Sequence, residues 1–415
     1  MVRGRLADTA DAVRRMASRL KKDATMPTVT LQHDMRPTPT PDEAARARFV
    51  SGLRSFVLND LAADLKSAYD RRAAPAYAAQ HGAEPATSDE AHHALKGDVA
   101  FATYSTLRVA AQKMVWGSVA EGVDRDAARL ASLAADVVGK PGALSLDPDL
   151  DVPHNVRAID VHLMPGSYTG TGGLAPGATY DRGLAVFSMG LMGANLDDIG
   201  LSMAHYVQHR YPDFAPADIL DLGCTVGHNS LPWKHAYPDA KLTGIDAAAP
   251  CLEYASARAK LQDVDADFVQ MRSDALAFPD ASFDLVFSSM FLHELPPAMR
   301  RKTLQDAYRV LRPGGLMLHM ELPPNDQMPA FEGFYLDWDS AYNAEPFYKN
   351  YRDQSPPALC EAAGFAREGY FQFVVPSLGI YGAEAIDAGA SADVGAATTG
   401  RLTEGVMWFG YGAWK

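Results

Sequence analysis

Residues 218–230 read DILDLGCTVGHNS, and this stretch decides the fold class. A short apolar run leads to Asp221, Gly223 and Gly227 follow it, and the next residues start a helical pattern. A turn between a strand and a helix lies at the carboxyl end of the strand, where open α/β sheets bind their ligands. The stretch therefore predicts a cofactor loop, although Thr225 stands where many such loops have a glycine.

The rest of the chain from residue 218 repeats this strand and helix pattern. Short, mostly apolar strands alternate with helical segments, which predicts a parallel sheet covered on both faces. Two strand-like runs at the end have no convincing helix between them and are expected to pair antiparallel at the sheet edge. We therefore expect an α/β fold with a doubly wound, Rossmann-like, mostly parallel sheet and an antiparallel last strand. The expected strands are 218–223, 241–246, 266–271, 283–289, 315–322, 369–377 and 405–415, and the expected helices between them are 228–237, 250–261 and 298–311.

The first third of the chain has a different composition. Residues 42–138 are rich in Ala, Leu, Arg and Asp. Apolar residues at 3–4 spacing predict helices over 42–69, 99–116 and 124–138. Residues 75–90 contain two prolines and mixed polar residues, and a loop is expected there.

Proline and glycine recur in the segment that follows the helical third. The run 159–164 has strand character, the glycine-dense stretch 165–183 is expected to be a mobile loop, and a helix is expected over 195–209. The chain is thus divided into a helical N-terminal domain (1–140), a linker or lid region (141–200) and an α/β domain (201–415).

The bulk composition limits the classes of function. The 415 residues carry a net charge of −13, so a broad basic surface for nucleic acid is not expected. Three scattered cysteines cannot form a disulfide framework, which fits a cytoplasmic protein. No apolar run is long enough for a transmembrane helix. The first 22 residues are basic, but Asp8 and Asp11 oppose a transit peptide or membrane-surface helix, and a solvated terminal helix is expected.

Two classes of cofactor compete for the loop at 223–228. A dinucleotide requires G-x-G-x-x-G, because its pyrophosphate approaches bare backbone and a helix N-terminus. The sequence GCTVGH lacks that pattern, and Asp221 would repel an anion. S-adenosylmethionine carries a sulfonium, an ammonium and a ribose diol but no phosphate, so nearby acids suit it. A nicotinamide oxidoreductase is therefore disfavoured.

At these residues the chain resembles the class I S-adenosylmethionine-dependent methyltransferases, whose loop reads roughly acid-x-G-x-G-x-G. Asp246, which ends LTGID, matches the acid that accepts hydrogen bonds from the ribose hydroxyls, and Asp274 matches the acid that faces the adenine. FPDASFDLVFSSMFLHEL and VLRPGGLMLHMEL resemble the fourth- and fifth-strand motifs of the family, and its UbiE-like, small-molecule branch has similar ones. The resemblance covers about residues 218–415 and implies S-adenosylmethionine as cofactor. The implied cofactor-binding residues are Asp221, Gly223, Cys224, Thr225, Gly227, Asp246, Ala247, Asp274, Ala275 and Ser289.

The acceptor side of the site is less defined. His293 and Glu294 follow the fourth strand and are the candidate catalytic bases, because a hydroxyl or ammonium nucleophile must lose a proton. Alternatively, they begin a short helix in which His293 is packed and Glu294 is solvated. The resemblance implies that the aromatic-rich insertion after the fifth strand lines the substrate pocket, although these aromatics could equally pack the insertion on the helical domain. The candidate substrate-binding residues are Phe331, Tyr335, Trp338 and Tyr342.

Two groups of histidines are candidate metal ligands. His205 and His209 lie four residues apart on one helical face, but no third ligand is identifiable. His154, Asp160 and His162 could converge, but strand alternation and loop polarity explain them as well. No metal is predicted.

The sequence thus predicts a methyltransferase for a small acceptor that is aromatic, lipid-like or an amine. Tyr168 and Tyr180 lie in the expected lid, and the N-terminal helices either complete the pocket or form a homodimer contact. The alternative is a catalytically inactive partner or regulatory subunit that binds S-adenosylmethionine, which Thr225 and the uncertain base would favour.

Overall fold

The computed structural model describes residues 33–389 and 406–415, so the basic helix expected over the first 22 residues lies outside the described residues. The described strands form one eight-stranded sheet in the order β1-β4-β3-β2-β5-β6-β8-β7. They are β1 (Leu144–Ser145), β2 (Asp218–Leu222), β3 (Lys241–Asp246), β4 (Asp267–Gln270), β5 (Phe283–Ser289), β6 (Leu311–Glu321), β7 (Tyr370–Pro376) and β8 (Met407–Trp414).

After the short edge strand β1, the chain continues the sheet from its centre, at β2, and changes direction there. From β2 it runs outward through β3 to β4, and it then returns to β5 on the other side of β2. These neighbours are parallel, whereas β8 pairs antiparallel with both β6 and β7. The predicted fold class is confirmed. Because the strand order reverses between β2 and β5, their carboxyl ends are where a ligand crevice forms.

Helices cover both faces of the sheet, and alternate residues of β2 show the division. Ile219 packs in a cluster that includes side chains of three covering helices, while Leu220, on the opposite face, packs in a cluster that includes side chains of two others. Both side chains are fully buried, as a parallel strand between two helical layers requires. The first set is α10 (Asp198–Arg210), α11 (Leu231–Ala236) and α12 (Ala249–Leu261), and the second is α13 (Pro297–Val310) and α16 (Pro356–Ala363).

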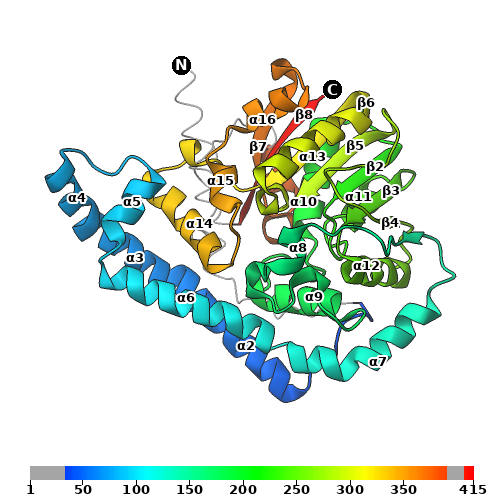
Figure 1. Cartoon of the computed structure of the whole chain (residues 1–415), viewed down its shortest axis with the longest axis horizontal. Coiled ribbons are helices and arrows are strands. Elements are labelled where there is room, and N and C mark those ends of the chain that lie inside the picture. The colour runs from blue at the N-terminus through cyan, green and yellow to red at the C-terminus, as the bar shows by residue number, and fades with distance from the viewer. Residues whose placement is uncertain (1–32, 390–405) are drawn as a thin grey trace.

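The N-terminal helices extend along one side of the molecule, away from the sheet (Figure 1). The first of them starts at a capping box, in which Thr40 and Glu43 satisfy each other's backbone N–H groups. A π-helical turn, Val57–Leu61, interrupts the helix expected over 42–69, and a second, Tyr69–Ala73, begins where that helix was expected to end. The helices are α2 (Pro41–Phe56), α3 (Ala62–Ala68), α4 (Ala74–His81), α5 (Ser88–Leu95), α6 (Val99–Gly117) and α7 (Ala120–Asp136).

The loop expected over 75–90 is largely wrong, because α4 and α5 occupy most of it. Thr87 and Glu90 form a second capping box that starts α5, a signal present in the sequence T-S-D-E. Gly82, at φ 80°, ends α4 in the left-handed conformation. The loop is therefore confined to the short connection between the two helices.

The segment after α7 also differs from the prediction. No strand forms over 159–164; α8 (His154–Ala158) is followed by a 3₁₀ turn at Val161–Leu163. The carbonyl of His162 accepts hydrogen bonds from Gln112 and Trp116, both at 2.7 Å, so α6 holds this backbone out of any sheet.

The glycine-dense stretch is a packed helix in its second half. After a 3₁₀ turn at Ser167–Thr169, α9 runs over Ala175–Phe187. A Cβ at Gly177 would lie 2.5 Å from Tyr254, and one at Gly183 would lie 2.3 Å from the Trp116 ring. These glycines therefore permit close packing, and the expectation of a mobile loop over 165–183 is wrong for this half.

The insertion after β6 returns to the N-terminal helices. It contains α14 (Ala330–Tyr342) and α15 (Tyr348–Arg352), and α14 packs against α5 and α6. Two short helices, α17 (Leu378–Tyr381) and α18 (Ala383–Gly389), follow β7. Over the described ranges, no helix is both long and apolar enough to cross a bilayer.

Candidate active site

A cavity of about 350 Å³ lies at the carboxyl ends of the central strands. The loop after β2 contributes Gly223 and Thr225, and Asp246 at the end of β3 contributes a carboxylate. The far wall comes from strand β8 and from segments outside the sheet, and it is mostly apolar. Its residues include Leu58, Leu184, Phe187, Met189, Met192, Leu322, Tyr335, Trp408 and Phe409.

The loop after β2 has the backbone of a glycine turn at all three predicted positions. Gly223, Thr225 and Gly227 have φ values of 71°, 48° and 76°. A Cβ at Gly223 would lie 2.2 Å from the Phe291 ring, so this position excludes a side chain. Thr225 tolerates the left-handed conformation at an energetic cost, because a β-branched residue rarely adopts it. The loop keeps its shape although the middle glycine is replaced.

Two carboxylates stand beside this loop. Asp246 accepts hydrogen bonds from the backbone N–H groups of Thr225 (3.0 Å) and Ala248 (2.9 Å), while burial raises its pKa to about 6. Burial also raises the pKa of Asp221 to about 7, against the opposing effect of the Ser230 hydroxyl, which donates to it at 2.5 Å. A cationic or hydrogen-bond-donating ligand would stabilise the ionised form of both carboxylates, so such a ligand is favoured beside them.

A chain of alternating acids and histidines forms another part of the wall. His293 lies between Glu321 (Nδ1 to Oε2, 2.6 Å) and Glu345 (Nε2 to Oε2, 3.5 Å). His162 lies between the same Glu345 (Nδ1 to Oε1, 3.2 Å) and Glu294 (Nε2 to Oε1, 3.5 Å). Burial lowers the pKa of both histidines, but the flanking carboxylates more than offset this and raise that of His162 to about 10.

A second buried network connects the loop to α9. Asp181 accepts hydrogen bonds from His228 (2.6 Å) and from the Tyr254 hydroxyl (2.6 Å), and it pairs with His33 at 3.0 Å. Burial raises the pKa of Asp181, but these partners more than offset that and hold it well below its usual range. His228 lines the cavity and directly follows Gly227, so this network fixes the start of the segment that follows the loop.

The structure brings many of the predicted cofactor residues together. Gly223, Cys224, Thr225, Asp221, Asp246 and Ser289 all line the cavity. Gly227, Ala247, Asp274 and Ala275 are not among its lining residues in the described part of the chain. Asp274 gives both carboxylate oxygens to the Arg272 guanidinium, at 3.0 and 2.9 Å, so its role toward adenine remains a prediction.

The predicted acceptor residues divide between the cavity and the surrounding core. His293 and Glu294 line the cavity, as do Tyr168 and Tyr180 of the expected lid, and Tyr335 is the member of the aromatic set that reaches it. Phe331 packs in the core formed with the N-terminal helices, and Tyr342 contacts the Trp338 indole and Ser105. Packing of the insertion against the N-terminal helices therefore accounts for Phe331 and Tyr342.

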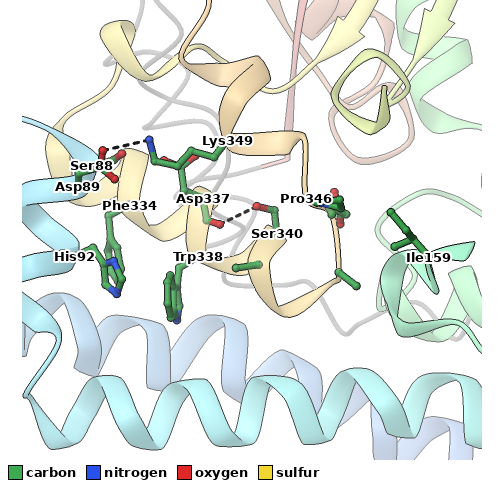
Figure 2. A pocket seen from close by; sticks show the side chains of 13 residues that line it. Ser88, Asp89, His92, Ile159, Phe334, Asp337, Trp338, Ser340, Pro346 and Lys349 are labelled. Carbon is green, nitrogen blue, oxygen red and sulfur yellow. Dashed lines mark hydrogen bonds and ion pairs between the residues drawn. The ribbon is translucent and has the colours of Figure 1, made fainter. Parts of the chain in front are cut away.

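Trp338 lies in a separate surface pocket of about 530 Å³ between α5 and α14 (Figure 2). In this pocket Lys349 pairs with Asp89 at 3.4 Å, and the Ser340 hydroxyl donates to the Asp337 carbonyl at 2.7 Å. Ser340 and Glu345 line this pocket and also the cavity, so the two hollows are neighbours.

The histidine pair on α10 has a carboxylate partner. His205 and His209 both contact Oδ1 of Asp387 on α18, at 2.8 and 3.1 Å. Over the ranges 33–389 and 406–415, no group of three or more His, Cys, Asp or Glu residues is arranged to hold a metal.

Sequence reasoning missed the site residues supplied from distant segments. Arg54 of α2, Glu345 after α14 and the Asp181 network carry no local motif, because their side-chain partners lie at least 47 residues away in the chain. His162 was considered only as a metal ligand. A lone residue of this kind shows its role only when the fold supplies its partners.

Comparisons with known proteins agree with this geometry. Residues 219–315 match the model of a methyltransferase domain. The chain is 36% identical over 110 residues to demethylmenaquinone methyltransferase of Thermus thermophilus. The aligned region covers 26% of this chain and 49% of that protein. It is 40% identical over 124 residues to 27-O-demethylrifamycin SV methyltransferase of Amycolatopsis mediterranei, covering 29% of this chain and 44% of the relative. The chain thus spans less than half the length of the curated relatives it matches.

A solved structure of an S-adenosylmethionine-dependent methyltransferase from Thermotoga maritima is also similar. The two chains are 15% identical, the aligned region covers 57% of this chain and 98% of the other, and the TM-score is 0.36. The match of residues 219–315 to a methyltransferase domain, the sheet order and the loop after β2 together support a class I S-adenosylmethionine-dependent methyltransferase domain in this part of the chain.

The residues present fit the cofactor of this class. Asp246 offers oxygens with remaining acceptor capacity to a ribose diol, and the left-handed loop exposes its backbone to the cavity. Arg54 is the single Lys or Arg among the described cavity-lining residues and comes from the N-terminal helices, so the loop has no basic side chain for a pyrophosphate. These donors and acceptors suit S-adenosylmethionine better than a dinucleotide.

Proposed function

We propose that this protein transfers a methyl group from S-adenosylmethionine to a small acceptor with an apolar or aromatic body. The observation that carries the proposal is the continuity of one cavity, in which the glycine-type loop and Asp246 share a space with an apolar wall. The names of the curated relatives, which act on a demethylmenaquinone and a demethylrifamycin, support an acceptor of this kind.

In this proposal the chain's main contribution is alignment. Methyl transfer is an in-line displacement, and holding nucleophile and methyl carbon at about 3 Å supplies several kcal/mol. S-adenosylmethionine, when bound, supplies the electrophilic methyl group. Tyr168 donates a hydrogen bond to Glu294 at 3.1 Å and is buried, so it holds that carboxylate at the cavity wall and helps to exclude water.

The proton of the acceptor would leave toward the acid–histidine chain. Glu294 is the best proton acceptor in it, because its side chain is 17% exposed while His293 and Glu345 are almost fully buried. Burial lowers the pKa of His293, but Glu321 and Glu345 more than offset this and raise it, which favours the protonated form that pairs with these carboxylates. We accordingly assign proton abstraction to Glu294 and a positioning role to His293.

The first test is calorimetric titration with S-adenosylhomocysteine, comparing the wild type with Asp246→Ala. We expect micromolar binding by the wild type and loss of at least thirty-fold in affinity in the variant, since two hydrogen bonds to a charged group disappear. Asp239→Ala, an exposed acid in the turn before β3, is the matched control and should bind as the wild type does.

A second test uses labelled donor and a panel of phenols, quinols and apolar amines. Transfer to an acceptor that Glu294→Gln slows without changing affinity for S-adenosylhomocysteine supports the proposal. Binding of the cofactor without transfer to any acceptor class would favour the inactive partner or regulatory subunit instead.

A further inference from the structure

Arg54, at the end of α2, is a buried guanidinium on the wall of the cavity. It is 2% exposed, its Nε donates to the Phe187 carbonyl at 3.0 Å, and its Nη1 donates to Oε1 of Gln112 at 2.5 Å. The guanidinium carbon also lies 4.2 Å from the centre of the Phe187 ring. All of these contacts are with neutral groups.

Asp339, a carboxylate on the same cavity wall, is already engaged by another arginine. Asp339 gives one oxygen to Nε of Arg108 and the other to Nη2 of Arg108, the latter at 3.0 Å. The oxygen of Gln112 that Arg54 contacts also accepts from Arg108 at 2.9 Å. Within the described residues, no Asp or Glu lies within ion-pair distance of Arg54. Among the described residues, Arg54 therefore has no ion-pair partner of its own.

The uncompensated charge has an energetic consequence. Burial lowers the pKa of Arg54 to about 9, and repulsion by Arg108 adds to this effect. A buried charge without an opposite charge is strongly unfavourable, so a ligand that supplies the counter-charge would stabilise Arg54. The π-helical turn Val57–Leu61 directly follows α2 and places Leu58 on the same cavity wall as Arg54. Such π-helical turns are frequent at functional sites.

The surroundings of Arg54 define the ligand that would pair with it. Phe187, Leu184 and Tyr335 line the cavity around it, and the Phe187 ring lies 5.8 Å from that of His162. The guanidinium and the acid–histidine chain are thus parts of one wall. An anion bound at Arg54 must therefore carry an apolar body, and the carboxylates of Glu294 and Glu345 would repel its charge from the other end.

We propose that the acceptor is a small organic acid with an apolar or aromatic body, whose carboxylate pairs with Arg54. This inference rests on the proposed function. The planar guanidinium suits a carboxylate because it can donate two parallel hydrogen bonds. The pairing would orient the acceptor with its acid group at α2 and the rest of its body in the apolar part of the cavity.

The experiment compares matched acids and amides on protein saturated with S-adenosylhomocysteine. The probes are two acid and amide pairs: 4-hydroxybenzoate with 4-hydroxybenzamide, and 3-hydroxy-2-naphthoate with its carboxamide. Their binding is measured by thermal shift and by calorimetry at constant ionic strength. The proteins are the wild type, Arg54→Gln and Arg54→Met, with Arg46→Gln as control, because Arg46 lies on the same helix and pairs on the surface with Glu121.

We expect the wild type and the Arg46→Gln control to bind at least one acid about ten-fold or more tightly than its amide. Both Arg54 variants should lose that preference while keeping their affinity for S-adenosylhomocysteine. Arg54→Met should unfold at the wild-type temperature or above it without ligand, since it removes an unpaired buried charge.

If the wild type binds each acid and its amide with equal affinity, or is stabilised by neither, the inference is overturned. A preference that survives in Arg54→Gln overturns it too. Failure of the wild type to bind S-adenosylhomocysteine would instead refute the proposed function, so the two failures are distinguishable.

Discussion

The backbone N–H of Thr225 donates a hydrogen bond to Oδ2 of Asp246 at 3.0 Å. This contact joins the glycine-type loop after β2 to the end of β3, so the loop and the acid expected to bind the ribose are positioned by one another. It also explains how a threonine can stay at φ 48°, because the hydrogen bond stabilises a backbone conformation that the side chain disfavours.

Replacing Thr225 by glycine should relieve this backbone strain. Strain of about 1–3 kcal/mol is removed, and the extra freedom of glycine in the unfolded chain costs about 0.5–1 kcal/mol. We expect a gain in the free energy of unfolding of up to about 2 kcal/mol, measured by chemical denaturation, and unchanged or tighter binding of S-adenosylhomocysteine. Thr225→Val keeps the strain and should show no gain. A loss of both stability and affinity in Thr225→Gly would assign an essential contact to the threonine side chain.

The affinity for S-adenosylhomocysteine should depend on pH through Asp246. Its pKa is raised to about 6, and only the ionised carboxylate can accept hydrogen bonds from both ribose hydroxyls. Affinity should therefore fall about ten-fold per pH unit below pH 6 and level off above it. Calorimetry from pH 5 to 8 measures this, and Asp246→Asn should bind weakly with no such break. A second break near pH 7 that Asp221→Asn removes would add Asp221 to the same contact.

Asp181→Asn should destabilise the protein strongly. The change leaves His33, His228 and Arg36 around a neutral amide in a buried site, and breaking such a network typically costs about 3–5 kcal/mol. Chemical denaturation measures the loss, and Asp213→Asn, an exposed acid before β2, should leave stability unchanged. Equal stabilities of the two variants would show that the network contributes little.

Stability should fall in alkaline solution through His162. Its pKa is about 10 in the folded protein and about 6.5 when unfolded, so its contribution is fully present below pH 6.5 and is lost as pH rises through 10. Glu345→Gln removes one of the two carboxylates that raise this pKa, and it should lose less stability than the wild type between pH 7 and 10. Glu361→Gln, which affects an exposed pair with Arg367, should follow the wild type. Parallel pH profiles for all three proteins would contradict this assignment.

The sequence alone was sufficient to predict the parallel sheet and the loop after β2. Apolar runs such as DILDL have one structural solution between two helical layers, and Asp221, Gly223 and Asp246 follow the strand ends that the fold brings together. Their positions depend on local pattern and on a general rule about parallel sheets. These features were therefore predictable without knowledge of any distant contact.

The acceptor side could not be predicted in the same way. Glycines at 177 and 183 suggested a mobile loop, but they are there because Tyr254 and Trp116 pack against them. The aromatic residues of α14 suggested a substrate wall, but most of them face the N-terminal helices. Whether a glycine or an aromatic residue serves packing or function depends on its partners, which tertiary contacts decide.

The position of β8 between β6 and β7 has a consequence for how the chain is made. Among the described strands, β7 pairs only with β8, whose residues 407–414 leave the ribosome after all the others described here. Until they emerge, β6 and β7 each present a row of unpaired backbone groups, which are templates for association with other chains. Between the synthesis of β7 and that of β8, these strand edges are therefore open to association with other chains.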